Sequence, residues 1–193
     1  IRRASGVEFG APGSEGLVRM TELVQQGLDA GAFGLSTGLE YDPGSRADVD
    51  ELVAIAEPVA AVGAVVSSHL RSEDADRVEE SLDELIEQGR RSGARVHASH
   101  LKIVLGSDTV RAAALLDQMA RARAEGVEVT ADVYPYTASY TGIGILFPDW
   151  AKPPNAYDTV VAERRDELAA HLRDRVNSRN GPCLLYTSPS PRD

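Results

Sequence analysis

Helical and strand patterns alternate along most of this 193-residue chain, and this alternation limits its possible folds more than any other feature. Apolar residues recur at helical spacing in four segments, each followed by a glycine, at 17–30, 48–62, 73–91 and 108–124. Short apolar or β-branched runs precede or separate them at 32–36, 64–69, 95–100 and 127–134. Strands that alternate with helices of this length are typical of βα units around a parallel sheet.

Two architectures share this alternation, a closed eight-stranded barrel and an open doubly wound sheet. Gly31, Gly34 and Gly38 do not form the G-x-G-x-x-G phosphate fingerprint, and the sequence contains no P-loop. We therefore expect an α/β fold with about four consecutive βα units of a partial (β/α)₈ barrel over residues 17–142, after a lead-in segment, 1–16. Residues 143–182, with a polar helix at 157–176, are expected to form a lid-like insertion.

The formal net charge of −10, with eighteen Arg and two Lys, argues against a nucleic-acid partner, which would need a basic surface. No apolar run approaches the roughly 20 residues that span a membrane, so no membrane partner is expected either. The Arg-rich, Lys-poor composition hints at a GC-rich bacterial source, and we expect a cytoplasmic protein. Because Lys is rare here, Lys102 draws attention.

The final residues, 183–193, read CLLYTSPSPRD and resemble the in-frame translation of a transposon-end adapter used in DNA sequencing libraries. A sequence of this kind carries no information about the fold. We therefore expect the natural protein to continue beyond Pro182 and exclude Cys183 from any predicted site. A genuine disordered Ser/Pro tail is the alternative.

Two similar motifs lie 31 residues apart, SSHLR at 67–71 and ASHLK at 98–102. Each places a histidine, His69 or His100, at the end of a predicted strand, with a cation two residues later. Neighbouring strands lie about 4.8 Å apart, so the two imidazoles can converge on one ion, and zinc accepts such ligands. The alternative is two hydrogen-bonded core histidines. We favour the metal site because the motif is repeated.

Other polar residues near these strand ends receive separate predictions. Strand alternation predicts that His97 points away from His100, toward the surrounding helices, and is structural. The same rule places Lys102 beside His100, where it would bind substrate. Asp132 is a weaker candidate ligand, and Tyr134 and Tyr136 would orient substrate or pack the rim.

Four motifs occur in an order that resembles the D-aminoacylase and N-acyl-D-amino-acid deacylase branch of the amidohydrolase superfamily. They are GAFGLSTGLEYDPG at 31–44, SHLR at 68–71, SHLK at 99–102 and DVYPY at 132–136. The resemblance covers about 17–152 and implies an amidohydrolase barrel beside a small β-domain.

Residue by residue, the resemblance implies that His69 and His100 hold Zn²⁺. It also implies that Lys102, Tyr41 and Tyr134 bind the carboxylate end of the substrate. Arg71, the matching cation after His69, is expected to bind substrate as well.

The resemblance further implies zinc-dependent hydrolysis of N-acyl-D-amino acids, giving a carboxylate and a free D-amino acid. The family's H-x-H pair and its catalytic Asp, the general base, have no match in this chain, so we expect the chain alone to be inactive and poorly soluble. Two alternatives remain open: an enzyme acting on cyclic amides, like a dihydroorotase or hydantoinase, and a non-catalytic scaffold derived from a barrel.

Overall fold

The computed structural model describes residues 1–104, 109–133, 135–136 and 141–178. The chain forms two compact units, Ile1–Tyr134 and Pro135–Asp193. The predicted adapter-like segment, 183–193, lies outside the described residues, as does Tyr134.

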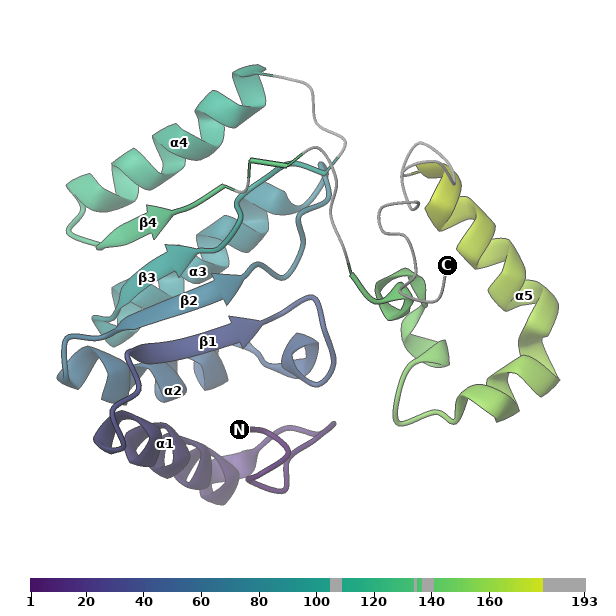
Figure 1. The fold of residues 1–193 in the computed structure, drawn as a ribbon, viewed down its shortest axis with the longest axis horizontal. Coiled ribbons are helices and arrows are strands. Elements are labelled where there is room, and N and C mark those ends of the chain that lie inside the picture. The colour runs from purple at the N-terminus through teal and green to yellow at the C-terminus, as the bar shows by residue number, and fades with distance from the viewer. Residues whose placement is uncertain (105–108, 134, 137–140, 179–193) are drawn as a thin grey trace. The chain divides into compact units, whose positions relative to one another are not determined.

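The first unit is built around a four-stranded parallel sheet (Figure 1). The strands, paired in chain order, are β1 (Gly34–Gly38), β2 (Val65–His69), β3 (Arg95–Ala98) and β4 (Val129–Ala131). The helices are α1 (Gly13–Asp29), α2 (Val49–Ala61), α3 (Val78–Ser92) and α4 (Thr109–Ala124), with a 3₁₀ turn η1 (Gly44–Arg46) after β1. The predicted α/β class and the four consecutive βα units are confirmed.

The helices cover one face of this sheet and form the core with it. Three valines that align across neighbouring strands, Val66, Val96 and Val129, are at most 1% exposed. They belong to one hydrophobic cluster that includes Leu52 of α2 and Leu82 of α3. Burial of this face is the main stabilising contribution, because apolar area removed from water contributes about 25 cal/mol per Å².

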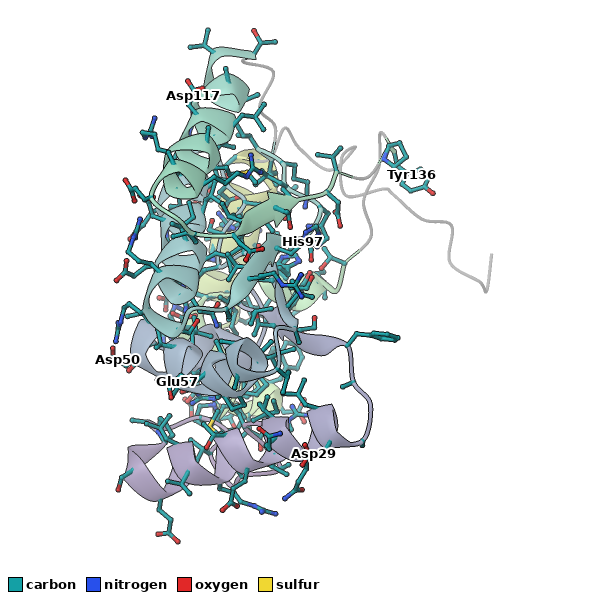
Figure 2. All side chains as sticks on the ribbon, turned by 90° about the vertical axis from the view of Figure 1, so that its left-hand side faces the viewer. Asp29, Asp50, Glu57, His97, Asp117 and Tyr136 are labelled. Atoms are coloured by element: carbon teal, nitrogen blue, oxygen red, sulfur yellow. The ribbon has the colours of Figure 1, made fainter. Side chains whose placement is uncertain are left out.

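The other face of the sheet carries polar side chains. The strand register aligns Ser67 with His97 and His97 with Thr130, and none of these three is buried. Figure 2 shows His97 on the side of the sheet away from Asp50 of α2 and Asp117 of α4. The prediction that His97 points toward the helices was therefore wrong. His97 lies on the same face of the sheet as Ser67 and His69.

Local chemistry explains several element boundaries. Asp48 caps α2 by accepting a hydrogen bond from the backbone N–H of Glu51 at 2.9 Å. Gly93 ends α3 with a φ of 74°, a conformation that costs glycine little. The predicted helix at 73–91 begins only at Val78, because residues 70–77 form a loop whose Asp74 pairs with Val104 in an isolated bridge.

The second unit contains two 3₁₀ turns, η2 (Ile143–Leu146) and η3 (Asp149–Ala151), and the helix α5 (Tyr157–Ser178). Ala151, Val160 and Leu168 form its small buried cluster. The Arg164 guanidinium lies 3.7 Å from the Trp150 ring centroid, where the chain leaves helical geometry. The predicted polar helix at 157–176 is present, whereas its role as a lid stays a prediction. No helix in the described ranges is long and apolar enough to cross a membrane.

Candidate metal centre

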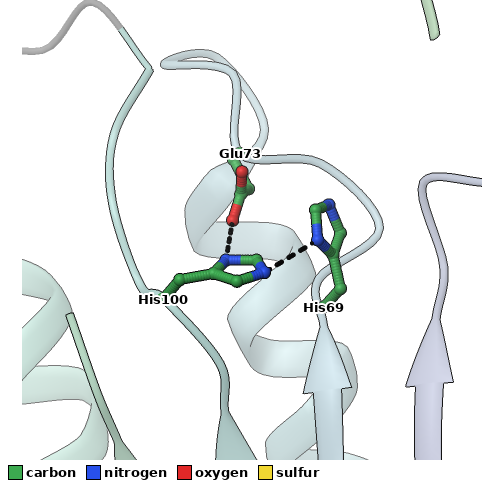
Figure 3. A group of neighbouring side chains, drawn as sticks. All are labelled: His69, Glu73 and His100. Atoms are coloured by element: carbon green, nitrogen blue, oxygen red, sulfur yellow. Dashed lines mark hydrogen bonds and ion pairs between the residues drawn. The ribbon is translucent and has the colours of Figure 1, made fainter. Parts of the chain in front are cut away.

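The two histidines that the sequence paired lie next to each other (Figure 3). His69 is the last residue of β2, and His100 lies two residues beyond β3. Their rings are 4.5 Å apart between centroids and inclined by 72°. Nδ1 of His69 lies 2.9 Å from Nε2 of His100, so the two rings present nitrogen atoms to the same point.

This meeting depends on the backbone at His100 rather than on strand alternation. Ser68 pairs with Ala98, so a continued β3 would place Ser99 opposite His69 and turn His100 toward the helices. Instead β3 ends, and His100 adopts a φ of 42°, which is uncommon for a residue other than glycine. The turn brings the His100 ring back to His69.

Asp132, just after β4, supports that turn. Its Oδ1 accepts a hydrogen bond from the backbone N–H of His100 at 2.6 Å, and its Oδ2 lies 2.9 Å from Nε2 of His97. His97 also contacts the Thr130 hydroxyl through Nδ1 at 2.8 Å. The hydrogen bond with His97, followed by that from the His100 backbone, lowers the pKa of Asp132. Asp132 thus holds the backbone of His100, and we assign it no ligand role.

Each histidine of the pair has a carboxylate on its second ring nitrogen. Oε2 of Glu40 lies 2.9 Å from Nε2 of His69, and Oε1 of Glu73 lies 2.8 Å from Nδ1 of His100. Glu73 is only 4% exposed. Sequence reasoning missed both: Glu40 lay within a motif without a role, and Glu73 was assigned to a helix. The available signal was an acidic residue four positions after His69.

Lys102 and Tyr41, two predicted substrate-binding residues, lie beside the pair. Nζ of Lys102 forms an ion pair with Glu73 and lies 3.1 Å from Nδ1 of His100. The Tyr41 ring is 4.9 Å from the His69 ring between centroids. Their substrate roles stay predictions.

Arg71, the third predicted substrate-binding residue, is engaged by the protein itself. Its guanidinium donates to both carboxylate oxygens of Glu84 in α3 at 2.8–3.1 Å. It also donates to the backbone carbonyls of Ser45 and Ala47 at 2.8 and 2.6 Å. These contacts fasten the loop after β1 to α3, and the geometry adds no support for substrate binding by Arg71.

The donor set fits a metal ion. Among the described residues, His69, Glu73 and His100 form a group whose ligand atoms all lie within 4.8 Å of one another. Imidazole nitrogen and carboxylate oxygen both suit divalent first-row metals. The carboxylates on the far nitrogens match the common arrangement in which an acidic residue orients a metal-binding histidine. His69, through Nδ1, and His100, through Nε2, are the residues placed to hold the ion.

No family model matches the chain. Among curated proteins of Alcaligenes xylosoxydans xylosoxydans, an N-acyl-D-glutamate deacylase is 43% identical over 132 residues, covering 68% of this chain and 26% of that protein. An N-acyl-D-aspartate deacylase from the same organism is 37% identical over 123 residues, covering 63% and 24%. The chain thus spans about a quarter of the length of these relatives.

Solved structures of deacylases are similar to this chain as well. The N-acyl-D-glutamate deacylase of Bordetella bronchiseptica, solved with zinc and a phosphonate mimic of the tetrahedral intermediate, superposes with a TM-score of 0.63 at 38% identity, over 66% of this chain and 27% of its own. A D-aminoacylase, described as defining a subset of amidohydrolases, gives 0.60 at 30% identity, over 65% and 26%. The first unit therefore corresponds to consecutive βα units of the amidohydrolase barrel, and this chain is related to the D-aminoacylase and N-acyl-D-amino-acid deacylase branch of that superfamily.

Proposed function

We propose that the protein to which these residues belong hydrolyses the amide bond of N-acyl-D-amino acids with Zn²⁺ as cofactor. The observation that carries this proposal is the convergence of His69 and His100 at the strand ends, within a segment similar to deacylases that include a zinc-containing structure. In barrel enzymes the active site lies at this edge of the sheet. Bound zinc would lower the pKa of a water ligand and polarise the acyl carbonyl.

The residues of this chain would hold the metal ion and orient the substrate. His69 and His100 supply nitrogen ligands, and Glu40 and Glu73 fix the rings from behind. In this proposal the Lys102 ammonium, which is ion-paired with Glu73, attracts the α-carboxylate of a substrate, and Tyr41, next to His69, limits how the substrate turns; the two contacts with the site support these roles. The general base stays assigned to an aspartate that this chain does not contain, so the 193 residues alone are expected to show no turnover. The cytoplasmic location also stays a prediction.

A chimera tests this function. The matching segment of the Alcaligenes N-acyl-D-glutamate deacylase would be replaced by the corresponding residues of this chain. We expect the folded, zinc-loaded chimera to release free amino acid from N-acetyl-D-amino acids and not from the L-isomers. His100→Ala within it should lose zinc and at least about 100-fold in turnover, because a metal ligand disappears.

Two outcomes would contradict the proposal. A folded chimera that holds zinc but hydrolyses only cyclic amides would favour the hydantoinase-like alternative. A folded chimera without bound metal, in which His100→Ala changes nothing, would favour the scaffold. Circular dichroism separates both outcomes from simple misfolding.

A further inference from the structure

Glu73 is a buried carboxylate that divides its two oxygens between two neighbours. Oε1 lies 2.8 Å from Nδ1 of His100, and Oε2 forms the ion pair with Nζ of Lys102. The Glu73 side chain is 5% exposed, against 29% for His100 and 26% for Lys102. Burying a carboxylate is costly unless it is paired, so its position in the loop after β2 depends on these two partners.

Nδ1 of His100 faces two groups with opposite demands. The Glu73 carboxylate can only accept, so it favours a proton on Nδ1. The Lys102 ammonium, 3.1 Å from the same nitrogen, can only donate, so it favours a lone pair there. In a neutral imidazole, the choice at Nδ1 fixes the opposite state at Nε2, the nitrogen that lies 2.9 Å from His69.

We propose that Glu73 is a positioning residue that selects the His100 tautomer with its lone pair on Nε2, by drawing the proton to Nδ1 and holding the Lys102 ammonium on its other oxygen. This inference rests on the proposed zinc site. Without Glu73, Lys102 would take the Nδ1 lone pair, place the proton on Nε2 and block the metal. Glu73 thereby links the metal ligand to the cation that we expect to bind the substrate carboxylate.

The competition between Glu73 and Lys102 predicts a specific pattern of zinc affinities. Glu73→Ala in this chain should weaken zinc binding about 10–100-fold, the usual effect of removing an orienting partner. Lys102→Ala should change it by less than about threefold. The double variant should recover part of the loss, because the competing donor is gone. A purely structural role for Glu73 would instead make the double variant as weak as Glu73→Ala or weaker.

Two controls keep the test sharp. Glu80→Ala removes an acidic side chain on α3 that is 80% exposed, and it should bind zinc like the wild type. Glu73→Gln keeps the side-chain volume in case the alanine variant does not fold. The zinc affinity of Glu73→Gln should fall between those of the wild type and Glu73→Ala. The amide oxygen can accept a hydrogen bond from Nδ1, but the NH₂ group then faces Lys102, and two donors cannot bond to each other.

Zinc affinity would be measured by competition with a chromophoric chelator, and the tautomer by ¹⁵N NMR of the histidine rings in metal-free protein. We expect the His100 lone pair on Nε2 in the wild type and on Nδ1 in Glu73→Ala. Failure of both the wild-type chain and the chimera to bind zinc would remove the proposed function. Normal zinc binding with an unchanged tautomer in Glu73→Ala, or no recovery in the double variant, would overturn the inference alone.

Discussion

At the scale of single residues, the candidate site depends on one unusual backbone conformation. His100 has a φ of 42°, and this turn brings its ring to His69. A regular continuation of β3 would direct the His100 side chain toward the helices instead. Such a conformation persists when its surroundings support it, and here the Asp132 carboxylate accepts the His100 N–H. Asp132 is in turn held by His97. A residue outside the metal-binding group therefore decides where a ligand points.

Asp132→Ala removes both of these hydrogen bonds and should loosen the His100 turn. We expect zinc affinity to fall about tenfold, comparable to the loss of other groups that orient a ligand. Chelator competition measures it. Asp117→Ala, an exposed acid on α4, is the matched control and should leave zinc affinity unchanged. Equal affinities for the two variants would show that Asp132 does not support the site.

At the scale of elements, β1 and β2 approach each other closely at Gly34. A Cβ at this position would lie 2.0 Å from the carbonyl oxygen of Val65, in the neighbouring strand. The pairing of β1 with β2 therefore requires glycine at position 34, because a side chain would not fit. Backbone conformation is not the reason, since Gly34 is not in the left-handed region. The loop that carries Glu40 follows β1 directly, so the pairing of β1 with β2 also positions the site.

Gly34→Ala should lower the free energy of unfolding by about 1–3 kcal/mol, as overpacking does. Gly27→Ala in α1 has nothing within 4 Å of the new methyl group and should raise it by about 0.5–1 kcal/mol through helix propensity. Urea unfolding followed by circular dichroism compares them. A neutral Gly34→Ala would mean that β1 does not pack this closely.

Helices α3 and α4 are joined by an ion pair that responds to pH. Arg111 donates to both carboxylate oxygens of Glu79 at 2.6–3.1 Å, and these hydrogen bonds lower the pKa of Glu79. Since the unfolded chain binds this proton more readily, the stabilisation is present above the ordinary glutamate pKa. It is lost as the pH falls through the lowered value of the folded protein.

Glu79→Gln should therefore destabilise the chain near pH 7, by at most about 1 kcal/mol because the pair is partly exposed. In more acidic solution the variant and the wild type should converge. Urea unfolding of both proteins from pH 7 down to pH 3 gives the comparison. A difference that stays constant or grows as the pH falls would contradict the assignment.

The helices and strands also show how much of the fold the sequence can predict. Periodicity located all four strands and the helices around them, because an apolar face must be buried whatever the details. It failed at Glu73, His97 and His100, where the outcome depends on where a strand stops and how the following turn bends. Those turns are fixed by contacts distant in sequence, such as that of Asp132 with His100, and no local pattern encodes them.

At the scale of the whole molecule, the first unit presents two strands that pair on one side only. Within the described residues, β1 pairs with β2 alone and β4 with β3 alone. Such strand edges offer backbone groups to another chain. The face with Ser67, His97 and Thr130 is polar, and none of these three side chains is buried.

The isolated chain should therefore self-associate as its concentration rises, which sedimentation velocity detects. Ser36→Lys, an exposed position of β1, should reduce the association because a lysine on an edge strand opposes pairing. The same change at Ser14, an exposed position of α1 outside the sheet, is the control. A monomer at all concentrations would contradict this view of the strand edges.

The central claim, that His69 and His100 share one metal ion, is tested most directly by a crystal structure of the zinc-loaded protein with anomalous scattering at the zinc edge. We predict one peak about 2.0–2.1 Å from both Nδ1 of His69 and Nε2 of His100. Rings that point into different compartments, or a zinc ion bound elsewhere with this pair still in direct contact, would contradict it.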